Sequence, residues 1–494
     1  MKRLFFAFVL SACATAPRPV PVPEQETAAP APPPRPWVRL PVPEPLAPIA
    51  RTRPPVRTQT LKNGLKVVVV EDHRARLVKT RLFLPGGSAG DHHELAGSTY
   101  FALALLGDTF DERDEIGRPT RPLENSARYL AMMAGAQLSF DVSSDSSWIG
   151  IDGYSVDTNT ILRRLESIVS ERRHGEFSFE GRAQAVVDQI NELELTDGEV
   201  LAQYLSQLAF GADHPYARPV FGTPQSVMRI GLEEIVERQR QLLTPVGATL
   251  LIAGDVKPDE VFLRVKAAFG DWEGVEVDPV ELSPPPVNKR RSVTFLPRRP
   301  SRNTLICLAR PLSDVKASTA ALSLAVSVLG EARMSAVLRE KLGLTYSVSA
   351  GVVERRAARA MLVCTRVKST ETVNATRVML EELAALESRP PSTLELETAR
   401  AKALTTVDTE QDDLGGIVAA WTQAAVMRRP APPENRAEEV RKVTVEELAL
   451  IARKLAATDH TQFIFSGERG LVEAAARANA LGPLKVPVLG RVTE

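Results

Sequence analysis

The chain has 494 residues, of which 44% are hydrophobic and 25% charged, and this composition is typical of a soluble globular protein with more than one domain. Lys and Arg total 61, as do Asp and Glu, so no net field favours nucleic acid or an anionic membrane surface. The three cysteines exclude a disulfide framework and a structural zinc cluster. Cys307 and Cys364 lie in apolar runs that predict buried strands, and the sequence leaves open whether they pair.

The first residues have the pattern of an export signal. Lys2 and Arg3 precede a short apolar run that ends in Leu10-Ser11-Ala12-Cys13. This resembles the lipobox of bacterial lipoproteins, which implies cleavage before Cys13 and acylation of its thiol, and an ordinary secretory signal is the alternative. We therefore expect residues 1–13 to be the signal, and the protein to be lipid-anchored at the bacterial outer membrane, facing the periplasm. Residues 14–56 are rich in Pro and Ala, which predicts an extended tether.

From about residue 57 the pattern predicts a folded body. Asn63-Gly64 is typical of a hairpin turn, and β-branched runs around it indicate strands. The predicted elements, in chain order, are strands at 66–70 and 77–84, a buried helix at 95–106, largely helical stretches at 122–142 and 158–206, a strand at 248–252 and a helix at 258–269.

A Pro-rich connector at 276–291 is followed by a similar order of elements. The predicted strands are 292–296, 304–308, 345–352, 360–367 and 461–465. The predicted helices are 316–329, 334–341, 370–387, 391–409 and 445–456. Because the two parts have similar length and order, we interpret the chain as two duplicated halves, 57–275 and 292–494.

Four stretches carry a resemblance to the insulinase-like family, which includes pitrilysin and the mitochondrial processing peptidases. They are TLKNGLKVVVVED at 60–72, FGADHPYARPVFGTPQSV at 210–227, LTPVGATLLIAGDV at 243–256 and ARMSAVLREKLGLTYSVSAG at 332–351. The resemblance implies an α+β fold of two homologous halves. Each half is expected to be a mostly antiparallel sheet covered by helices.

Active members of this family carry H-x-x-E-H on a helix of the first half. Two histidines four residues apart share one Zn²⁺, the Glu activates a water, and a later Glu completes the ligands. The matching run here places Tyr100 and Ala104 at the histidine positions and Leu103 at the position of the base. Gln189 aligns best with the later Glu, although a slip of register would bring Asp188 or Glu192 there.

The resemblance therefore implies a degenerate zinc site, with no catalytic residue and no cofactor bound by this chain. His92-His93-Glu94 offers no replacement, because adjacent histidines point to different sides of a helix or strand, and we interpret it as a solvated loop. His214, within the second matching stretch, is expected to be structural.

One functional pair of the family is retained. An Arg and a Tyr seven residues apart in the second half contact the substrate in active members, and they match Arg339 and Tyr346. In two-chain bacterial members one chain supplies the zinc and the other this pair. The resemblance thus implies a non-catalytic subunit that binds peptide substrate beside an insulinase-like partner with an intact zinc motif, or beside a second copy of itself. The alternatives are an envelope scaffold or binding lipoprotein with no peptidase partner, and an active metallopeptidase with unusual ligands.

Overall fold

The structure is a computed structural model that describes residues 53–106, 127–170, 176–193, 206, 210–211, 213–276, 280–284, 291–296, 301–410 and 412–486. All of these residues belong to one compact unit, Arg53–Glu494. The predicted signal with Cys13, the tether up to residue 52 and parts of the predicted linker 276–291 lie outside the described residues.

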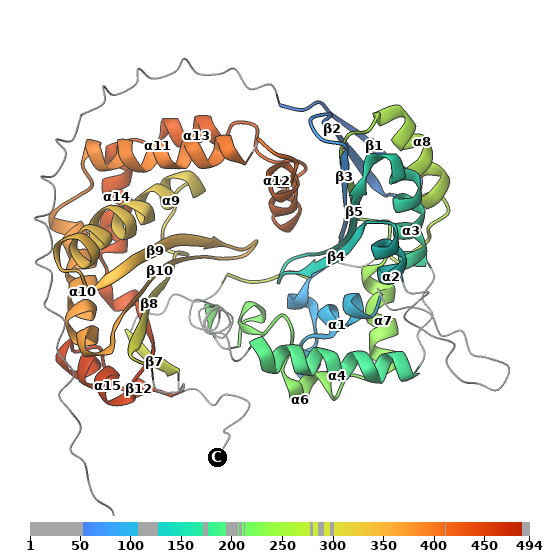
Figure 1. Ribbon diagram of the computed structural model, residues 1–494. Coiled ribbons are helices and arrows are strands. Elements are labelled where there is room, and N and C mark those ends of the chain that lie inside the picture. Colours follow the sequence, from blue (N-terminus) through green and yellow to red (C-terminus); the bar gives the residue numbers. More distant parts are fainter. Residues whose placement is uncertain are drawn as a thin grey trace, which may run out of the picture. The chain divides into compact units, whose positions relative to one another are not determined.

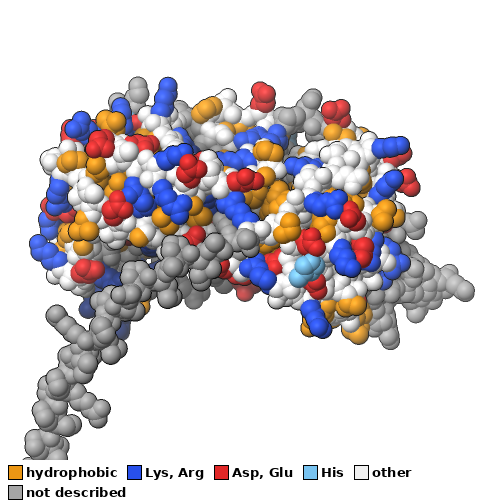
Figure 2. Space-filling model, turned by 90° about the horizontal axis from the view of Figure 1, so that it is seen from above, with side chains coloured by type: hydrophobic (Ala, Val, Ile, Leu, Met, Phe, Trp, Pro, Cys, Tyr) orange, Lys and Arg blue, Asp and Glu red, His pale blue; other side chains and the backbone are white. Residues whose placement is uncertain are grey.

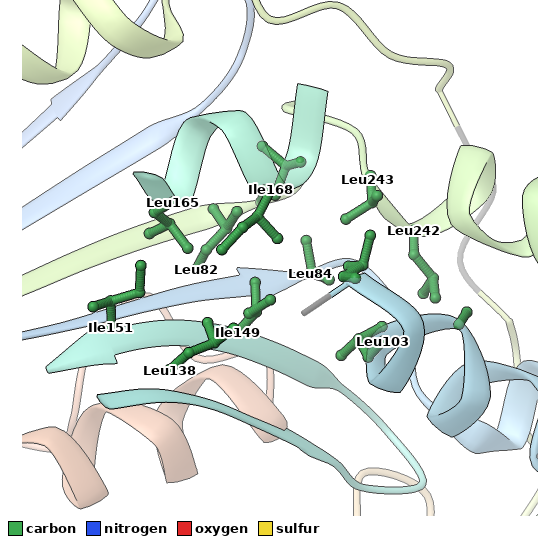
Figure 3. Packing of buried hydrophobic residues seen from close by; sticks show 14 of the residues in the cluster. Leu82, Leu84, Leu103, Leu138, Ile149, Ile151, Leu165, Ile168, Leu242 and Leu243 are labelled. Atoms are coloured by element: carbon green, nitrogen blue, oxygen red, sulfur yellow. The ribbon is translucent and has the colours of Figure 1, made fainter. Parts of the chain in front are cut away.

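The first half forms a six-stranded sheet in the order β1-β2-β6-β3-β5-β4, in which β2 and β6 run parallel and the other neighbours antiparallel (Figure 1). Its strands are β1 (Val56–Thr60), β2 (Lys66–Glu71), β3 (Leu77–Leu84), β4 (Gln137–Val142), β5 (Ser147–Tyr154) and β6 (Thr249–Gly254). Its helices are α1 (Ser98–Leu106), α2 (Ala127–Met133), α3 (Thr158–Ser170), α4 (Glu176–Leu193), α6 (Pro224–Val227), α7 (Leu232–Leu242) and α8 (Pro258–Phe269). Side chains from one face of the sheet join those of the helices in one buried cluster (Figure 3).

The second half forms another six-stranded sheet, in the order β12-β7-β11-β8-β10-β9. Its strands are β7 (Ser292–Leu296), β8 (Asn303–Pro311), β9 (Thr345–Glu354), β10 (Arg359–Lys368), β11 (Gln462–Ser466) and β12 (Leu484–Lys485). Its helices are α9 (Thr319–Ser327), two π-helical segments (Val328–Met334 and Ala336–Lys341), α10 (Thr372–Ser388), α11 (Thr393–Thr409), α12 (Leu414–Val426), α13 (Arg436–Lys442), α14 (Val445–Leu455) and α15 (Arg469–Ala478). The helical stretch Thr319–Lys341 is apolar and long enough to span a membrane by composition, but it is largely buried within this half.

The two sheets have the same topology. Without the edge strands β1 and β12, the orders are β2-β6-β3-β5-β4 and β7-β11-β8-β10-β9. Numbered within its own half, each sheet therefore reads first, fifth, second, fourth, third. This shared order confirms the predicted fold class, an α+β fold of two similar halves with mostly antiparallel sheets.

The prediction of a helix at 122–142 is wrong for its last part. Residues 127–133 form α2, but Gln137–Val142 is strand β4, in which Leu138 and Val142 are buried. The strand Ser147–Tyr154 is absent from the prediction, as are α12, α13 and α15. The predicted helices at 316–329 and 334–341 are joined into one helical stretch, of which the second part is π-helical.

Helix α12 belongs to the second half by sequence but packs on the first sheet. Strand β2 reads KVVVVE, and its valines are buried on both faces, so the face that α1, α3, α4, α7 and α8 leave open needs a separate cover. Helix α12 provides that cover. Its residues Ile417, Val418 and Trp421 form one buried cluster with five residues of the sheet, namely Val68, Val70, Phe83, Leu251 and Ala253. The predicted halves are therefore not independent folding units.

Cys307 and Cys364 form a disulfide, which answers a question that the sequence leaves open. They lie directly opposite each other on the antiparallel strands β8 and β10, with Cα atoms 4.1 Å apart. The disulfide ties two neighbouring strands of the second sheet at a single register.

We predict that removing the indole of α12 destabilises the whole chain. Trp421 is only 8% exposed, so Trp421→Ala is expected to lower the free energy of unfolding by about 3–5 kcal/mol, the usual cost of truncating a buried aromatic residue. Leu450→Ala on α14, where the side chain is 64% exposed, is the control and is expected to change little. Denaturant unfolding measures both variants, and equal small losses would show that α12 does not hold the first sheet.

The turn after β2 contains an ion-pair network that connects to the residues before α12. His73 Nδ1 lies 2.6 Å from Asp255 Oδ1, and its Nε2 lies 2.9 Å from Glu71 Oε1. These two carboxylates raise the pKa of His73, Asp255 having the larger effect. Next to it, Arg74 donates from NH1 to the carbonyl oxygen of Asp412, 2.5 Å away. The charged imidazolium thus strengthens a turn that contacts the connection to α12.

The raised pKa predicts a pH-dependent stability. A histidine whose folded-state pKa is raised stabilises the fold fully below its unfolded pKa of about 6.5, and that contribution disappears as the pH rises through the folded-state value. We therefore expect the denaturation midpoint of the wild type to exceed that of His73→Asn near pH 6, and the difference to shrink toward pH 8. A difference that grows with pH would contradict this assignment.

Candidate functional site

Helix α1 corresponds to the zinc helix of the resemblance, and all of its residues are buried. Its N-terminus is capped by the carboxylate of Asp91, which accepts hydrogen bonds from the amides of Gly97 (3.0 Å) and Thr99 (3.1 Å). In its second turn the carbonyl of Ala102 accepts a hydrogen bond from Gln239 Nε2 of α7, 2.8 Å away. The position of α1 is therefore set by polar contacts that involve no metal.

Two glycines, Gly97 just before α1 and Gly222 in the second matching stretch, allow a close backbone crossing at the start of α1. Gly97 has a φ of +95°, and a Cβ there would lie 2.6 Å from the carbonyl oxygen of Phe221. Gly222 has a φ of +78°, and a Cβ there would lie 2.3 Å from the carbonyl oxygen of Ala96. Both positions exclude larger residues, so this part of the motif serves packing.

The structure brings two of the aligned zinc positions together. Tyr100 of α1 donates a hydrogen bond from its hydroxyl to Oε1 of Gln189 on α4, 2.8 Å away. The Tyr100 ring packs against Phe221 and Phe140, with centroids 4.5 and 5.4 Å away. Burial raises the pKa of Tyr100, against the opposing effect of the hydrogen bond to Gln189. The phenol therefore stays neutral and donates its proton to an amide, which is not a ligand arrangement for Zn²⁺.

The other two aligned positions are apolar. Leu103 and Ala104 are 1% and 2% exposed and belong to the core of the first half. Figure 3 shows Leu103 on α1 within the same cluster as Leu84 and Leu242. Neither side chain has a lone pair for a metal or can remove a proton from water. The residues at these positions therefore do not fit the zinc ion of the family.

Two of the other residues near these positions, Asp188 and His92, have other contacts. Asp188 accepts a hydrogen bond from Gln184 one turn earlier on α4, 2.8 Å away. His92 caps a short 3-10 helix by accepting from the amide of Glu94, so the histidine pair lies in a capped loop. Throughout the described part of the chain, no three His, Cys, Asp or Glu side chains gather in a group that suits a metal.

Arg339 and Tyr346 meet at the surface of the second half. The π-helical segment ends at Lys341, and the chain turns back through Leu344, whose amide donates to the carbonyl of Leu338 (2.7 Å) before β9 begins. This turn places the Arg339 guanidinium over the Tyr346 ring, 5.6 Å from its centroid. Tyr346 is 87% exposed, and among the described residues the Arg339 guanidinium makes no hydrogen bond or ion pair. Both groups therefore face solvent, where a ligand can reach them.

The His214-Pro215-Tyr216 motif is structural in its contacts. His214 caps a short 3-10 helix through Nδ1 and lies 2.9 Å from the carbonyl of Ser283 through Nε2. The Tyr216 hydroxyl donates to Asp145 Oδ1, 2.6 Å away, and accepts from the amide of Ala357 in the second half, 3.0 Å away. Sequence reasoning missed Asp145, since it lies among serines in a polar turn with no signal of burial.

The fold and the site together define a two-half chain in which the α1 and α4 positions of the insulinase-like zinc site hold a tyrosine and a glutamine. Comparison with known proteins agrees with this class. A family model described as the peptidase M16 inactive domain matches residues 229–403. A probable mitochondrial-processing peptidase subunit beta from Arabidopsis thaliana is 24% identical over 216 residues, which are 44% of this chain and 39% of that protein.

An uncharacterised zinc protease from Mycobacterium leprae is 23% identical over 296 residues, which are 58% of this chain and 64% of that protein. The chain thus spans less than two thirds of the length of these two relatives. Among solved structures, a protease from Helicobacter pylori matches with a TM-score of 0.74 at 15% identity, over 84% of this chain and 100% of that one. An M16 inactive domain from Pseudomonas fluorescens matches with a TM-score of 0.70 at 18% identity, over 84% and 98%. The chain is therefore similar to proteins of the insulinase-like (M16) peptidase family, and the family model that matches residues 229–403 is that of an inactive domain.

We predict that α1 and α4 still hold positions 100, 104 and 189 where zinc-binding side chains could meet, although the residues now there do not bind zinc. Tyr100 and Gln189 already touch, so Tyr100→His, Ala104→His and Gln189→Glu together are expected to raise bound zinc from near zero to about one ion per chain. Zinc stoichiometry after metal-free purification and zinc add-back measures this.

The wild type and a variant with a fourth substitution complete this experiment. Adding Leu103→Glu tests for recovery of a general base, while the triple variant avoids placing a charge in the core. About one zinc in the wild type would contradict the alignment, and His92, His93 and Glu192 would then be the first residues to mutate.

Proposed function

We propose that this chain is the non-catalytic subunit of a zinc-dependent peptidase pair in the bacterial cell envelope. It supplies Arg339 and Tyr346 to hold the peptide substrate, together with walls of the substrate chamber, while a partner chain with an intact H-x-x-E-H motif supplies the zinc. The observation that carries the proposal is the contrast between the two sites. The Tyr100–Gln189 contact fills the zinc position, whereas the Arg–Tyr pair is exposed.

The chemistry of the exposed pair supports a role in peptide binding. A guanidinium holds a peptide carbonyl or carboxylate through its planar fork of donors, and a tyrosine hydroxyl donates to an oxyanion that develops on a carbonyl. A helix-end salt bridge and a packed aromatic ring would be the structural explanation of the same motif. Arg339 has no ion-pair partner among the described residues and Tyr346 is 87% exposed, so that explanation has no support here.

Two further observations support the partner and the location. One relative is named as a subunit of a processing peptidase, which favours a paired assembly. The Cys307–Cys364 disulfide favours export, because disulfides persist in oxidising compartments such as the periplasm. This agrees with the predicted lipobox at Cys13. Self-association of two copies of this chain would provide no zinc, so an insulinase-like chain of another sequence is the partner that we propose.

The proposal predicts different peptidase activity for the isolated chain and for the chain paired with its partner. The isolated chain is expected not to cleave unfolded peptides, while the reconstituted pair cleaves them in a chelator-sensitive manner. In the pair, Arg339→Ala is expected to lower kcat/KM, and Tyr346→Phe to lower kcat about 100-fold if its hydroxyl contacts the oxyanion. Assembly, measured by size-exclusion chromatography, is expected to remain unchanged because both side chains are exposed.

Lys341→Ala is the matched control, since it removes the same charge from the same helical segment but not the guanidinium that lies over Tyr346. Unchanged activity in Arg339→Ala would leave the pair with a structural role only. Chelator-sensitive cleavage by the isolated chain would sink the proposal and favour a peptidase with unusual ligands. A chain that finds no zinc-bearing partner would instead act as an envelope scaffold.

A further inference from the structure

The turn between β9 and β10 is held by a buried acid of the first half. The side chain of Asp145 is fully buried and accepts from the amide of Arg356 (3.0 Å) and the hydroxyl of Tyr216 (2.6 Å). The amide of Ala357 donates to the same hydroxyl, 3.0 Å away. The turn therefore has a defined position, and the arginines that it carries are presented by a rigid backbone.

A second element brings arginines to the same place. Helix α12 ends at Val426, and Arg428 follows in the left-handed region with a φ of 50°, which a non-glycine residue rarely adopts. The side chain of Arg428 is exposed, and among the described residues it makes no hydrogen bond or ion pair. Arg429, the next residue, lies 3.8 Å from Glu354 at the end of β9. A strained position therefore displays a cation that makes no hydrogen bond or ion pair with any described residue.

Among the residues that the structure describes, the cations in this place outnumber the anions. Arg355, Arg356, Arg428 and Arg429 form what we call the arginine cluster, and the acids beside them are Asp145 and Glu354. Glu354 also accepts from the hydroxyl of Thr319, and Asp145 is engaged by the contacts above. Arg428 adjoins Arg429, which lies 3.8 Å from Glu354, the residue before Arg355 and Arg356, so the end of α12 and the β9–β10 turn bring their arginines to one place. An added anion would balance the excess positive charge of the described residues in this place.

We propose that the arginine cluster binds a carboxylate of the peptide held by Arg339 and Tyr346. Guanidinium groups suit this ligand, because they form paired, charge-assisted hydrogen bonds with planar carboxylates. Both sites lie on β9, with Tyr346 near its start and the cluster at its end. From Tyr346 to Arg355 the strand rises roughly 30 Å, so the carboxylate would lie about nine residues from the segment at Tyr346. The proposal rests on the peptide-binding function proposed above and adds a preference for acidic groups at a fixed distance.

The test uses the full chain and three dye-labelled peptides of roughly 12 residues, long enough to span β9, which share one uncharged core sequence and differ only at the C-terminal end. One peptide has a free C-terminus, the second has an amidated end, and the third is amidated with a Glu beside the end. Fluorescence anisotropy at low salt is expected to show about tenfold tighter binding of a carboxylate-bearing peptide than of the uncharged one. Preference for the first identifies a terminal carboxylate, and preference for the third identifies an acidic side chain. Equal Kd values for all three would overturn the proposal.

Arg428→Gly is the decisive variant. Glycine adopts the observed φ without strain, so the thermal midpoint is expected to stay the same or rise, while the tenfold preference for a carboxylate is lost. Arg453→Gln on α14 removes another exposed arginine and is expected to keep the preference. If Arg428→Gly keeps the preference as well, the cluster is not the binding site.

The failure of this inference can be told apart from that of the proposed function. Arg339→Ala is expected to raise the Kd of all three peptides by the same factor, so the ratio between their Kd values stays the same. If Arg339→Ala weakens binding but the peptides never differ, the arginine cluster alone is wrong. If the wild type binds none of the peptides, both proposals fall.

Discussion

The burial of β2 and β6 on both faces is the constraint on which the architecture depends. A parallel pair of all-apolar strands cannot leave one face in water, and the helices of the first half cover the other face. The missing cover is α12, which the chain supplies more than 150 residues after β6. The halves share a strand order, but this exchange of a helix makes them one cooperative unit. Asp145 and Tyr216 of the first half also form hydrogen bonds with the β9–β10 turn, so polar contacts join the halves in addition to the apolar contact of α12.

The residues at the aligned zinc positions do not fit the metal, and the helix that carries three of them is held in place by side chains of this chain. Helix α1 is fixed by Asp91 at its start and by Gln239 in its second turn. At two of the aligned positions a phenol and an amide satisfy each other, where an unpaired polar group would be costly. Leu103 and Ala104 extend the core instead of facing a metal.

The sequence predicted those elements whose partners are close or whose pattern is unambiguous. Strands β2, β3 and β7 were found within a residue, because β-branched runs bounded by turn residues have few other interpretations. Strand β4 was taken for helix because it follows α2 closely, although Leu138 and Val142 keep the period of two. Helix α12 was missed because Gly415-Gly416 weakens its helical signal and its apolar face matches a sheet that is distant in sequence. The family resemblance singled out Tyr100 and Gln189 as aligned positions, but their contact required the structure. Asp145 and Arg428 also required it, because neither burial nor backbone strain can be read from these residues in the sequence.

The late position of α12 has a consequence for biogenesis. A chain that emerges from a ribosome or translocon N-terminus first completes the strands of the first sheet by residue 254, but its cover begins only at Leu414. Through that interval the open face of β2, β3 and β6 presents a band of valine, leucine and phenylalanine to its surroundings. An exposed apolar surface of this kind can bind chaperones and can also lead to aggregation. The nascent chain is therefore most prone to aggregation after β6 has been synthesised and before α12 has.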